Sequence, residues 1–200
     1  MNCIAIIPAG GKGLRVGIAT KKGFATPKQY LKVNGKEIIV YTLQAFQKNK
    51  LINKIIVAAE QDYFSLLIKL VKKYKLTKVE LIVEGGKTRQ HSVFNAVLSS
   101  DANDNDLLVV HDAARALLPE NVLTNSILSA KIIGNALVCI KAKDTLIKGK
   151  KFVDEYLNRD EVYYVQTPQI FKYKDLYKAL IKAEKENFVG TDESLSLIHI

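Results

Sequence analysis

A glycine-rich segment near the start of the chain has the composition of a phosphate-binding loop. It is the run Pro8-Ala9-Gly10-Gly11-Lys12-Gly13-Leu14-Arg15. Small residues let backbone N–H groups approach phosphate oxygens closely, and here they stand at Ala9, Gly10, Gly11 and Gly13. The spacing is neither that of the dinucleotide motif G-x-G-x-x-G nor that of a P-loop, which continues with Gly-Lys-Ser/Thr. With the cations Lys12 and Arg15, the segment favours a nucleoside triphosphate.

A further cation, Lys28, stands in the motif Pro27-Lys28-Gln29-Tyr30-Leu31. Nucleotidyl transfer needs positive charge held against the oxygens where negative charge accumulates in the transition state. A sugar phosphate is already an anionic nucleophile, so the reaction requires no general base. Arg15 and Lys28 are therefore the candidate catalytic residues, converging on the α-phosphate of the nucleotide.

An acidic residue, Asp112, follows one of the apolar runs of the chain. Ligands dock at the carboxyl ends of the strands in an open parallel sheet, so this carboxylate would emerge beside the triphosphate. The two would repel each other unless a cation bridged them, which predicts Mg²⁺ with Asp112 as its ligand. The alternative is that Asp112 caps a helix beginning at Ala113. We interpret His111 as a structural residue at the end of the strand.

Arginine is rare in this basic chain. Lys and Arg together number 30 and the net charge is +10, yet arginine stands only at Arg15, Arg89, Arg115 and Arg159. The planar guanidinium of arginine is a rigid fork of N–H donors that suits phosphate and carboxylate. Each arginine lies in or beside a segment singled out on other grounds. The lysines are spread along the chain as on solvated helix faces. Because the sequence has no basic stripe interleaved with aromatic residues, we expect no nucleic-acid partner.

The elements that must position these residues alternate along the chain. Apolar, β-branched runs predict strands at Cys3–Pro8, Lys54–Ala59, Val79–Glu84, Asp106–His111, Ala136–Ile140 and Val162–Gln166. Helical periodicity predicts helices at Ile38–Gln47, Tyr63–Tyr74, Thr88–Leu98, Asn121–Ile132 and Lys174–Lys185. The near-continuous apolar strands indicate a sheet covered on both faces. We expect an α/β fold with a single doubly wound, mostly parallel, Rossmann-like sheet.

One stretch, residues 141–160, breaks this alternation. It is polar and charged, and Lys148-Gly149-Lys150 in its middle is a turn signal. We therefore expect a β-arm projecting from a single domain that spans residues 1–200.

Composition points to a cytoplasmic protein without a membrane partner. Hydrophobic residues make up 48% and charged residues 25%, which is typical of globular proteins. No apolar run reaches the roughly 20 residues of a spanning helix, and residues 1–7 predict a first strand instead of a signal peptide. Cys3 and Cys139 lie inside apolar runs, so we expect buried, reduced thiols.

Ordered motifs carry a family resemblance that runs from Ile4 to about Ser194. They are the glycine-rich start, Pro27-Lys28-Gln29-Tyr30, Glu84-Gly85-Gly86-Lys87-Thr88-Arg89, Val110-His111-Asp112-Ala113-Ala114-Arg115 and Gln166-Thr167-Pro168-Gln169. In order and spacing they resemble those of the 2-C-methyl-D-erythritol 4-phosphate cytidylyltransferases. The resemblance implies transfer of CMP from CTP to this polyol phosphate, with release of pyrophosphate, in non-mevalonate isoprenoid biosynthesis.

The resemblance also assigns roles to individual residues. Arg15 and Lys28 would stabilise the pentacoordinate α-phosphate. The nucleotide would contact Ala9, Gly10, Gly11, Gly13, Gly85, Gly86, Lys87, Ser92 and Ala113. Gly85-Gly86 could instead be an ordinary turn between a strand and a helix.

The projecting arm acquires a function from the same resemblance. Members of the family form homodimers through such an arm, which contacts the substrate phosphate of the neighbouring subunit. The matching substrate-binding residues are Asp144, Thr145, Arg159, Thr167 and Thr191. The alternatives are an ion pair of Arg159 with Asp160 or Glu161 and an ordinary turn at Asp144-Thr145.

The chain departs from the family pattern in three places. The segment 16–27 is longer than usual and is either a lid over the triphosphate or a surface insertion. Ala116 replaces a proline. After about residue 194 an apolar tail stands where the family continues to a lysine that contacts the nucleotide phosphates, and we expect a truncated end. The alternative functions are a ribitol-5-phosphate cytidylyltransferase and a truncated, non-catalytic nucleotide-binding module.

Overall fold

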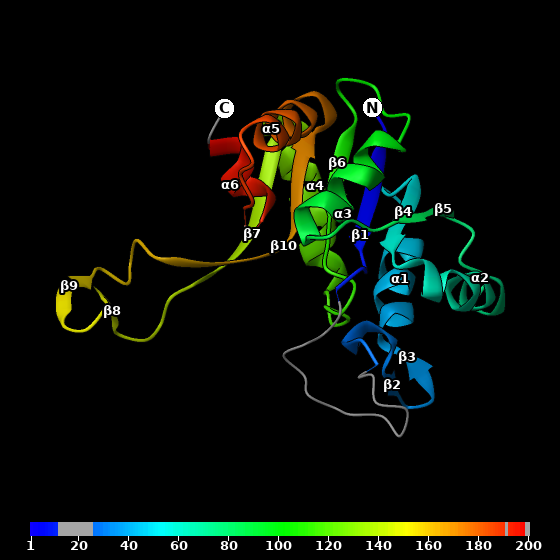
Figure 1. The fold of residues 1–200 in the computed structure, drawn as a ribbon, viewed down its shortest axis with the longest axis horizontal. Helices are drawn as coiled ribbons and strands as arrows, with labels where there is room; N and C mark the ends of the chain where they lie inside the picture. The colour runs from blue at the N-terminus through cyan, green and yellow to red at the C-terminus, as the bar shows by residue number, and fades with distance from the viewer. Residues whose placement is uncertain (12–25, 191, 199–200) are drawn as a thin grey trace.

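The computed structural model of the chain describes residues 1–11, 26–190 and 192–198. The predicted site residues Gly13, Arg15 and Thr191 lie outside this part of the chain. Within it, a six-stranded sheet has the strand order β5-β4-β1-β6-β10-β7 (Figure 1). Its strands are β1 (Cys3–Pro8), β4 (Lys54–Ala59), β5 (Val79–Glu84), β6 (Leu107–Val110), β7 (Asn135–Lys141) and β10 (Tyr163–Lys172).

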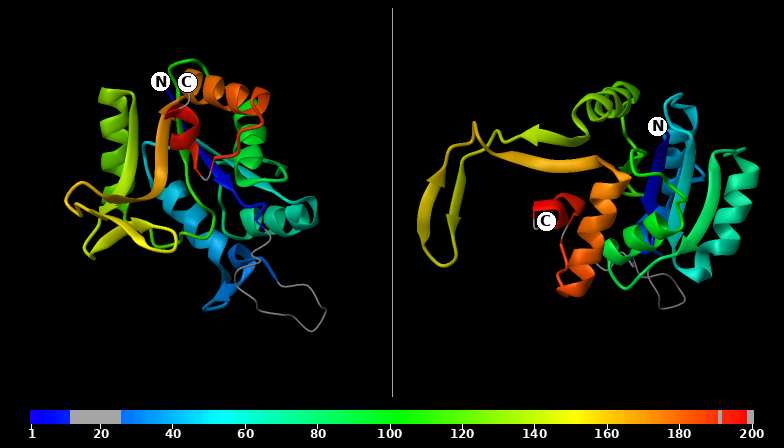
Figure 2. Two further views of the ribbon diagram at one scale, coloured as in Figure 1. Left: turned by 60° about the vertical axis from the view of Figure 1, so that its left-hand side comes forward. Right: turned by 90° about the horizontal axis from the view of Figure 1, so that it is seen from above.

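Helices cover both faces of this sheet, as Figure 2 shows. They are α1 (Ile38–Lys48), α2 (Phe64–Lys73), α3 (Arg89–Leu98), α4 (Glu120–Ile133), α5 (Tyr173–Lys185) and α6 (Glu193–Ile198). Successive residues of a strand point to opposite faces, so Ala5 and Ile7 of β1 join the core under α1, α2 and α4. Ile4 and Ile6 join the core under α3 and α5. The predicted doubly wound architecture is confirmed.

The sheet is mostly parallel, with one antiparallel strand. Strand β1 runs parallel to β4 and β6, and β4 runs parallel to β5. Strand β10 is antiparallel to both of its neighbours, β6 and β7. It extends to Lys172, beyond the strand end predicted at Gln166. Its pairing with β7 shifts register between Val165 and Gln169, where the chain is irregular.

The expectation of full coverage on both faces is wrong at the two edges of the sheet. Leu81 on β5 is 36% exposed, and Ile140 on β7 is 55% exposed. An edge strand has a neighbour on one side only, and the helices cover the middle of the sheet best. Cys139 is likewise exposed, which corrects the prediction of a buried thiol, whereas Cys3 is buried as predicted. Both cysteines are free.

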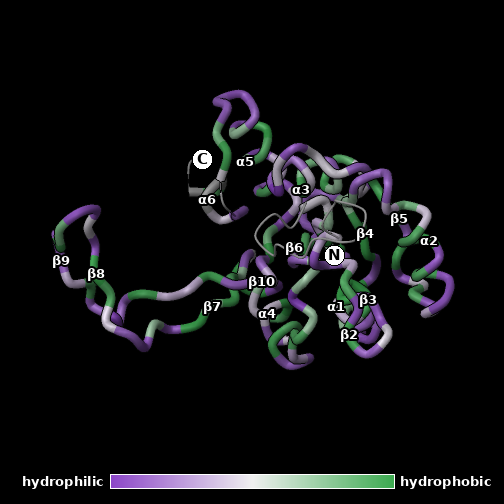
Figure 3. Tube along the Cα trace, turned by 60° about the horizontal axis from the view of Figure 1, so that its bottom comes forward, coloured by the Kyte–Doolittle hydropathy of each residue, from purple (hydrophilic) through white to green (hydrophobic). Residues whose placement is uncertain are grey.

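The projecting arm is present. Strands β8 (Leu146–Gly149) and β9 (Val153–Leu157) pair antiparallel at its tip. Figure 1 shows this hairpin far from the body, connected to it by the ends of β7 and β10. Figure 3 shows hydrophobic and hydrophilic segments alternating along the arm, and Phe152 is 78% exposed at its tip.

Some small elements were not predicted. A hairpin of β2 (Lys32–Val33) and β3 (Lys36–Glu37) turns at Asn34 and Gly35, which have φ angles of 50° and 74°. Positive φ at both turn positions is the conformation that Asn-Gly favours. Among the described residues, no helix combines the length and the apolar character needed to cross a membrane.

Candidate active site

The predicted site residues gather where the parallel strands end. Ala9 to Gly11 follow β1, Gly85 and Gly86 follow β5, and Asp112 follows β6. The carboxyl ends of parallel strands meet at one edge of a sheet, which is the usual place for a ligand. The site has two halves, one over β5, β4 and β1 and one over β6 and β10.

The first half is a close approach of two glycine segments. A Cβ atom added to Gly10 would lie 3.3 Å from Ser92 Oγ and 3.7 Å from Gly85 Cα. One added to Gly85 would lie 3.2 Å from Ser92 Oγ and 3.4 Å from the carbonyl carbon of Ala59. Ser92 Oγ also accepts a hydrogen bond from the Gly86 N–H over 3.0 Å. The structure therefore brings together Gly10, Gly85, Gly86 and Ser92, all predicted to bind the nucleotide.

Gly86 also has a purely structural reason to be glycine. A Cβ atom added there would lie only 2.2 Å from the Cβ of His91, on the first turn of α3. Thr88 caps this helix by accepting the His91 N–H over 3.1 Å, and Lys87 beside it is exposed. A tight turn between strand and helix, the alternative that the sequence left open, is therefore part of the role of Gly86.

Gln29 connects the second motif to the phosphate loop. Its side chain is buried, and its Nε2 donates hydrogen bonds to Ala9 O over 2.6 Å and to Gly11 O over 3.0 Å. Lys28, the preceding residue, is exposed beside this contact on a 3₁₀ turn that spans Lys28–Tyr30. The sequence placed Gln29 in a motif without giving it a role, because only the fold shows which carbonyl groups it meets.

The second half of the site is centred on Asp112. Its Oδ1 accepts from Arg89 Nε over 2.8 Å, and its Oδ2 accepts from Arg115 Nε over 2.9 Å. Burial raises the pKa of the Asp112 carboxyl, but the charge of Arg89 and the hydrogen bonds from both arginines outweigh it and hold the pKa below the usual value. A second nitrogen of Arg115 donates to Gln166 Oε1.

Asp112 is not a helix cap. The Arg115 N–H donates to the Asp112 carbonyl over 3.0 Å and closes a turn, and the next helix, α4, begins only at Glu120. The alternative of a helix beginning at Ala113 is therefore wrong. Ala113 itself is buried, and its carbonyl accepts the Thr42 hydroxyl over 2.9 Å.

A buried histidine stabilises this turn through hydrogen bonds. His111 is 1% exposed, and its Nε2 lies 3.0 Å from Arg115 O, so that nitrogen donates. Its Nδ1 then accepts the Thr167 hydroxyl over 3.0 Å, and Thr167 Oγ1 accepts the Asp112 N–H over 3.3 Å. Burial lowers the pKa of His111 to about 4, so the ring is neutral at pH 7. These contacts give His111 the structural role predicted for it.

Arg89 and Glu193 form a contact in the site, and neither of them had a role assigned from the sequence. Arg89 Nη1 donates to Glu193 Oε1 over 2.6 Å, although the two residues are 104 positions apart. Glu193 is 1% exposed, and burial raises its pKa, with Arg89 partly offsetting this effect. The sequence pointed to Arg89 through the scarcity of arginine and through the motif that ends at this residue, but no signal pointed to Glu193.

The structure does not bring the arm residues to these clusters within one chain. Asp144, Thr145 and Arg159 are exposed on the arm, which extends away from the body (Figure 1). Arg159 donates to the Lys143 carbonyl over 3.3 Å, while Asp160 pairs with Lys141 over 2.8 Å. The alternative pairing of Arg159 with its acidic neighbours is therefore not formed.

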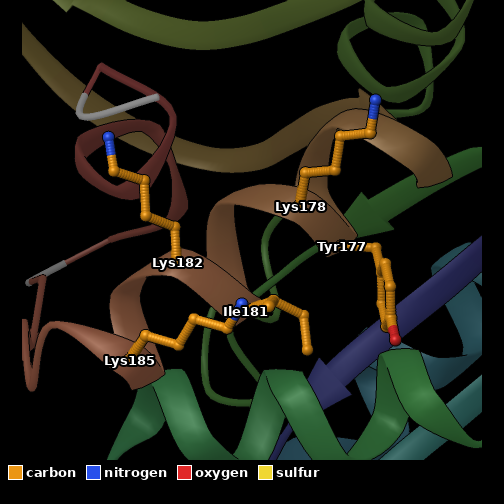
Figure 4. Close-up of a pocket in the computed structure, with 5 residues that line it drawn as sticks. All are labelled: Tyr177, Lys178, Ile181, Lys182 and Lys185. Carbon is orange, nitrogen blue, oxygen red and sulfur yellow. The ribbon is translucent and has the colours of Figure 1, made fainter.

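Two hollows lie outside the glycine segments and the Asp112 turn, and the larger is also lined by Asp192 and Ser194, which flank Glu193. One, of about 260 Å³, is on the outer side of α5 (Figure 4) and is lined by Tyr177, Lys178, Ile181, Lys182 and Lys185. A larger one, of about 690 Å³, lies between α6 and strands β7 and β10, with Leu137, Val165, Phe171 and Leu197 in its walls. Neither is lined by Asp112 or by the glycines of the phosphate loop.

One edge of the doubly wound sheet carries the backbone of two glycine turns, a neighbouring lysine and a carboxylate held by arginine. These features define an α/β nucleotidyltransferase. The model of the family named IspD, 2-C-methyl-D-erythritol 4-phosphate cytidylyltransferase, matches residues 3–200. The chain belongs to this family. The match runs past Ser194, where we expected the resemblance to end.

Individual relatives agree with this assignment. A protein of Clostridium acetobutylicum named 2-C-methyl-D-erythritol 4-phosphate cytidylyltransferase is 38% identical over 198 residues, which are 98% of this chain and 82% of that protein. One of Streptococcus agalactiae serotype V, named ribitol-5-phosphate cytidylyltransferase, is 34% identical, over 99% of this chain and 82% of its own. The solved 2-C-methyl-D-erythritol 4-phosphate cytidylyltransferase of Francisella tularensis has a TM-score of 0.79 at 30% identity, covering 100% of this chain and 86% of that one.

Proposed function

We propose that this chain transfers CMP from CTP to 2-C-methyl-D-erythritol 4-phosphate, giving the CDP-methylerythritol intermediate of non-mevalonate isoprenoid biosynthesis and pyrophosphate. The observation that carries the proposal is the meeting of two unlike clusters at the carboxyl edge of the sheet. Gly10, Gly85 and Ser92 form a close backbone surface suited to a nucleotide. Asp112 and Arg115 form a charged, polar surface beside it, suited to the acceptor.

The chemistry follows from these positions. An oxygen of the acceptor phosphate attacks the α-phosphorus of CTP in line, a new P–O bond forms, and the bond to the β-phosphate oxygen breaks as pyrophosphate leaves. Negative charge grows on the α-phosphate oxygens and on the leaving group. Lys28 and Arg15 are the cations that stabilise this charge in the transition state. Lys28 is well suited because Gln29, next to it, binds the phosphate loop directly.

Mg²⁺ is part of the proposal, with Asp112 as its protein ligand. The described residues hold no group of three or more His, Cys, Asp or Glu side chains able to bind a metal ion. Each Asp112 oxygen accepts one arginine N–H and keeps a second lone pair. Mg²⁺ commonly takes one or two carboxylates together with substrate phosphates. Asp112 therefore fits as the single protein ligand of an ion carried by the triphosphate, whose charge that ion would neutralise.

The acceptor is proposed to be shared between two subunits. Arg159, with Thr145 and Asp144 near it, is a guanidinium suited to a phosphate monoester. These residues are exposed and extend away from their own body, so they are free to reach a neighbour. We therefore propose a homodimer in which each arm completes the substrate site of the other chain, together with Thr167 and Thr191 of that chain. We also propose that the protein is cytoplasmic.

A second candidate acceptor is ribitol 5-phosphate. The relative of Streptococcus agalactiae named for that activity aligns over 99% of this chain at 34% identity. One acceptor has a methyl-branched four-carbon chain and the other a straight five-carbon chain with one more hydroxyl group, and a few contacts can distinguish them.

The deciding experiment measures pyrophosphate release by the purified chain with Mg²⁺ and CTP, with each acceptor in parallel. Release with methylerythritol phosphate alone supports the main proposal, and release with ribitol phosphate alone transfers it to the second acceptor. No release with either, together with measurable CTP binding, would support the non-catalytic nucleotide-binding module.

A further inference from the structure

Arg89 lies between the two halves of the site. It is the first residue of α3, directly after the segment that carries Gly85 and Gly86. Its side chain contacts two carboxylates outside this nucleotide half: Nε donates to Asp112 over 2.8 Å, and Nη1 donates to Glu193 over 2.6 Å. One guanidinium thus connects the start of α3, the turn after β6 and the start of α6.

The two carboxylates depend on this guanidinium. Glu193 is 1% exposed, and its Oε2 has no hydrogen-bond partner among the described residues. The charge of Asp112 is close enough to raise the pKa of Glu193 further. Without Arg89, the two acids would repel each other, and a buried carboxylate would lose its counter-charge. Removal of one partner from a buried ion pair is strongly destabilising for that reason.

Other contacts hold the C-terminal segment on the same surface. Gln90, next to Arg89, accepts the Gly190 N–H over 2.7 Å and donates to Phe188 O over 3.0 Å. The Ser194 N–H donates to Gln169 Oε1 over 3.3 Å. Because these bonds dock the segment without Arg89, the contribution of Arg89 is orientation: its rigid fork sets the direction of both carboxylates at once.

We propose that Arg89 is a positioning residue for the acceptor half of the site. Through Asp112 it positions the turn after β6, and through Glu193 it positions the segment that follows Thr191. It does not touch the reacting atoms. The kinetic effect expected of Arg89 rests on the proposed function, whereas its effect on the structure does not. Arg89→Lys keeps the charge and loses the fork, so the Asp112 turn and the start of α6 should loosen together. Glu193→Gln keeps one acceptor for Nη1 and should loosen the start of α6 more mildly.

The first test is hydrogen exchange of the backbone amides, with no substrate present. In Arg89→Lys, exchange should accelerate about tenfold or more both in residues 112–115 and in residues 192–198, with the core strand β1 unchanged. The matched control is Glu184→Gln, which removes the carboxylate that His91, also on α3, contacts over 2.6 Å. It should leave both segments at wild-type rates. Wild-type exchange in both segments of Arg89→Lys would overturn the inference.

The second test separates the two substrates in folded variants. Arg89→Lys should lower kcat/KM for the acceptor by about 10- to 100-fold, since a small misplacement has effects of that size. Its dissociation constant for CTP, measured without Mg²⁺ so that Asp112 does not contact the nucleotide through the ion, should change by less than about threefold, because Gly10, Gly85 and Ser92 do not contact the fork. Equal losses for both substrates would show a general structural defect and overturn the inference.

Should Arg89→Lys not fold, Glu193→Gln gives the same readouts, expected as a several-fold rise in acceptor KM. If the wild type releases no pyrophosphate, the proposed function fails, while the exchange experiment still decides the role of Arg89.

Discussion

The side-chain amide of Gln29 donates one hydrogen bond to the carbonyl oxygen of Ala9, over 2.6 Å, and a second to that of Gly11, over 3.0 Å. A single buried amide thereby joins the phosphate loop to the turn that carries Lys28. Gln29 therefore fixes the position of Lys28 relative to the backbone that is proposed to bind the nucleotide.

Replacing Gln29 by Ala should loosen the phosphate loop. The Ala9 carbonyl, in a buried residue, would lose its donor, and an unsatisfied buried group reduces the free energy of unfolding by about 1–3 kcal/mol. CTP affinity should fall as well, because the loop is no longer held beside Lys28. Urea unfolding and calorimetric CTP titration measure the two effects. Gln44→Ala, which removes a more exposed contact with Lys36, is the control and should change neither. Unchanged CTP affinity in Gln29→Ala would contradict the role given to this amide.

Gly86 and Gly11 should respond differently to the same substitution. A Cβ at position 86 would meet the Cβ of His91 at 2.2 Å and its carbonyl carbon at 2.9 Å, so the start of α3 must shift. Overpacking of this kind lowers the free energy of unfolding by about 1–3 kcal/mol. A Cβ at position 11 meets nothing described within 4 Å, so Gly11→Ala should leave folding stability unchanged. Thermal unfolding of the two variants makes the comparison, and equal stabilities would count against the packing argument.

The central strands were predictable because their sequence pattern is local. Residues 3–8, 54–59 and 79–84 are short apolar runs, and the structure has strands at those bounds. Strand β10 was predicted too short, because Pro168 lacks the N–H that a continuing strand donates, yet the strand resumes at Gln169 beside β6. Cys139 reads as a core residue by its apolar neighbours, but it lies on the edge strand that leaves for the arm.

Within the site, several residues named by a motif come together in the structure, whereas side-chain pairs between distant segments were not predicted. Gly10, Gly85 and Ser92 were predicted, and the structure brings them together. Arg89 and Glu193 could not be paired from the sequence, because 104 positions separate them and a glutamate in a short terminal helix has no distinguishing pattern. Sequence periodicity describes which face a residue occupies, whereas a side-chain network depends on the meeting of distant elements.

Asp106 should make folding stability depend on acidity. It is 3% exposed, and although burial raises its pKa, hydrogen bonds from the N–H groups of Asn103 and Asn2 outweigh burial and lower it below 3.8. A carboxyl whose folded pKa is depressed adds stability above its unfolded pKa and loses that stability as the pH falls through the folded value. Asp106→Asn should therefore be less stable than wild type by about 1–3 kcal/mol near neutral pH. The difference should shrink as the pH falls below 3.8 towards the lowered pKa of the folded state. A difference in unfolding free energy that stays constant with pH would disprove this account.

Loss of either candidate catalytic cation should affect turnover more than acceptor binding. In the proposed mechanism, Lys28→Ala and Arg15→Ala each remove a charge that stabilises the α-phosphate in the transition state, and the loss of one such group lowers kcat by about 10²–10³-fold. The acceptor KM should change little, because other residues are proposed to hold the acceptor. Steady-state pyrophosphate release at saturating CTP measures both constants. Lys36→Ala, in the neighbouring β2–β3 hairpin, is the control and should keep wild-type kinetics. A change confined to the acceptor KM would remove these residues from the catalytic role.

The sharing of the site between subunits can be tested by mixing two inactive variants. Lys28→Ala damages the body of a chain, and Arg159→Ala damages its arm, so each homodimer should be inactive or nearly so. If the arm acts on the neighbouring chain, a mixed dimer contains one site with an intact Lys28 and an intact Arg159. Random re-association then restores about a quarter of the wild-type activity, because half of the dimers are mixed and each has one intact site. If the arm served its own chain, mixing would restore nothing, since every site would keep one damaged residue. The experiment needs unfolding and refolding of the mixture, with each variant refolded alone as its control, and pyrophosphate release as the measurement.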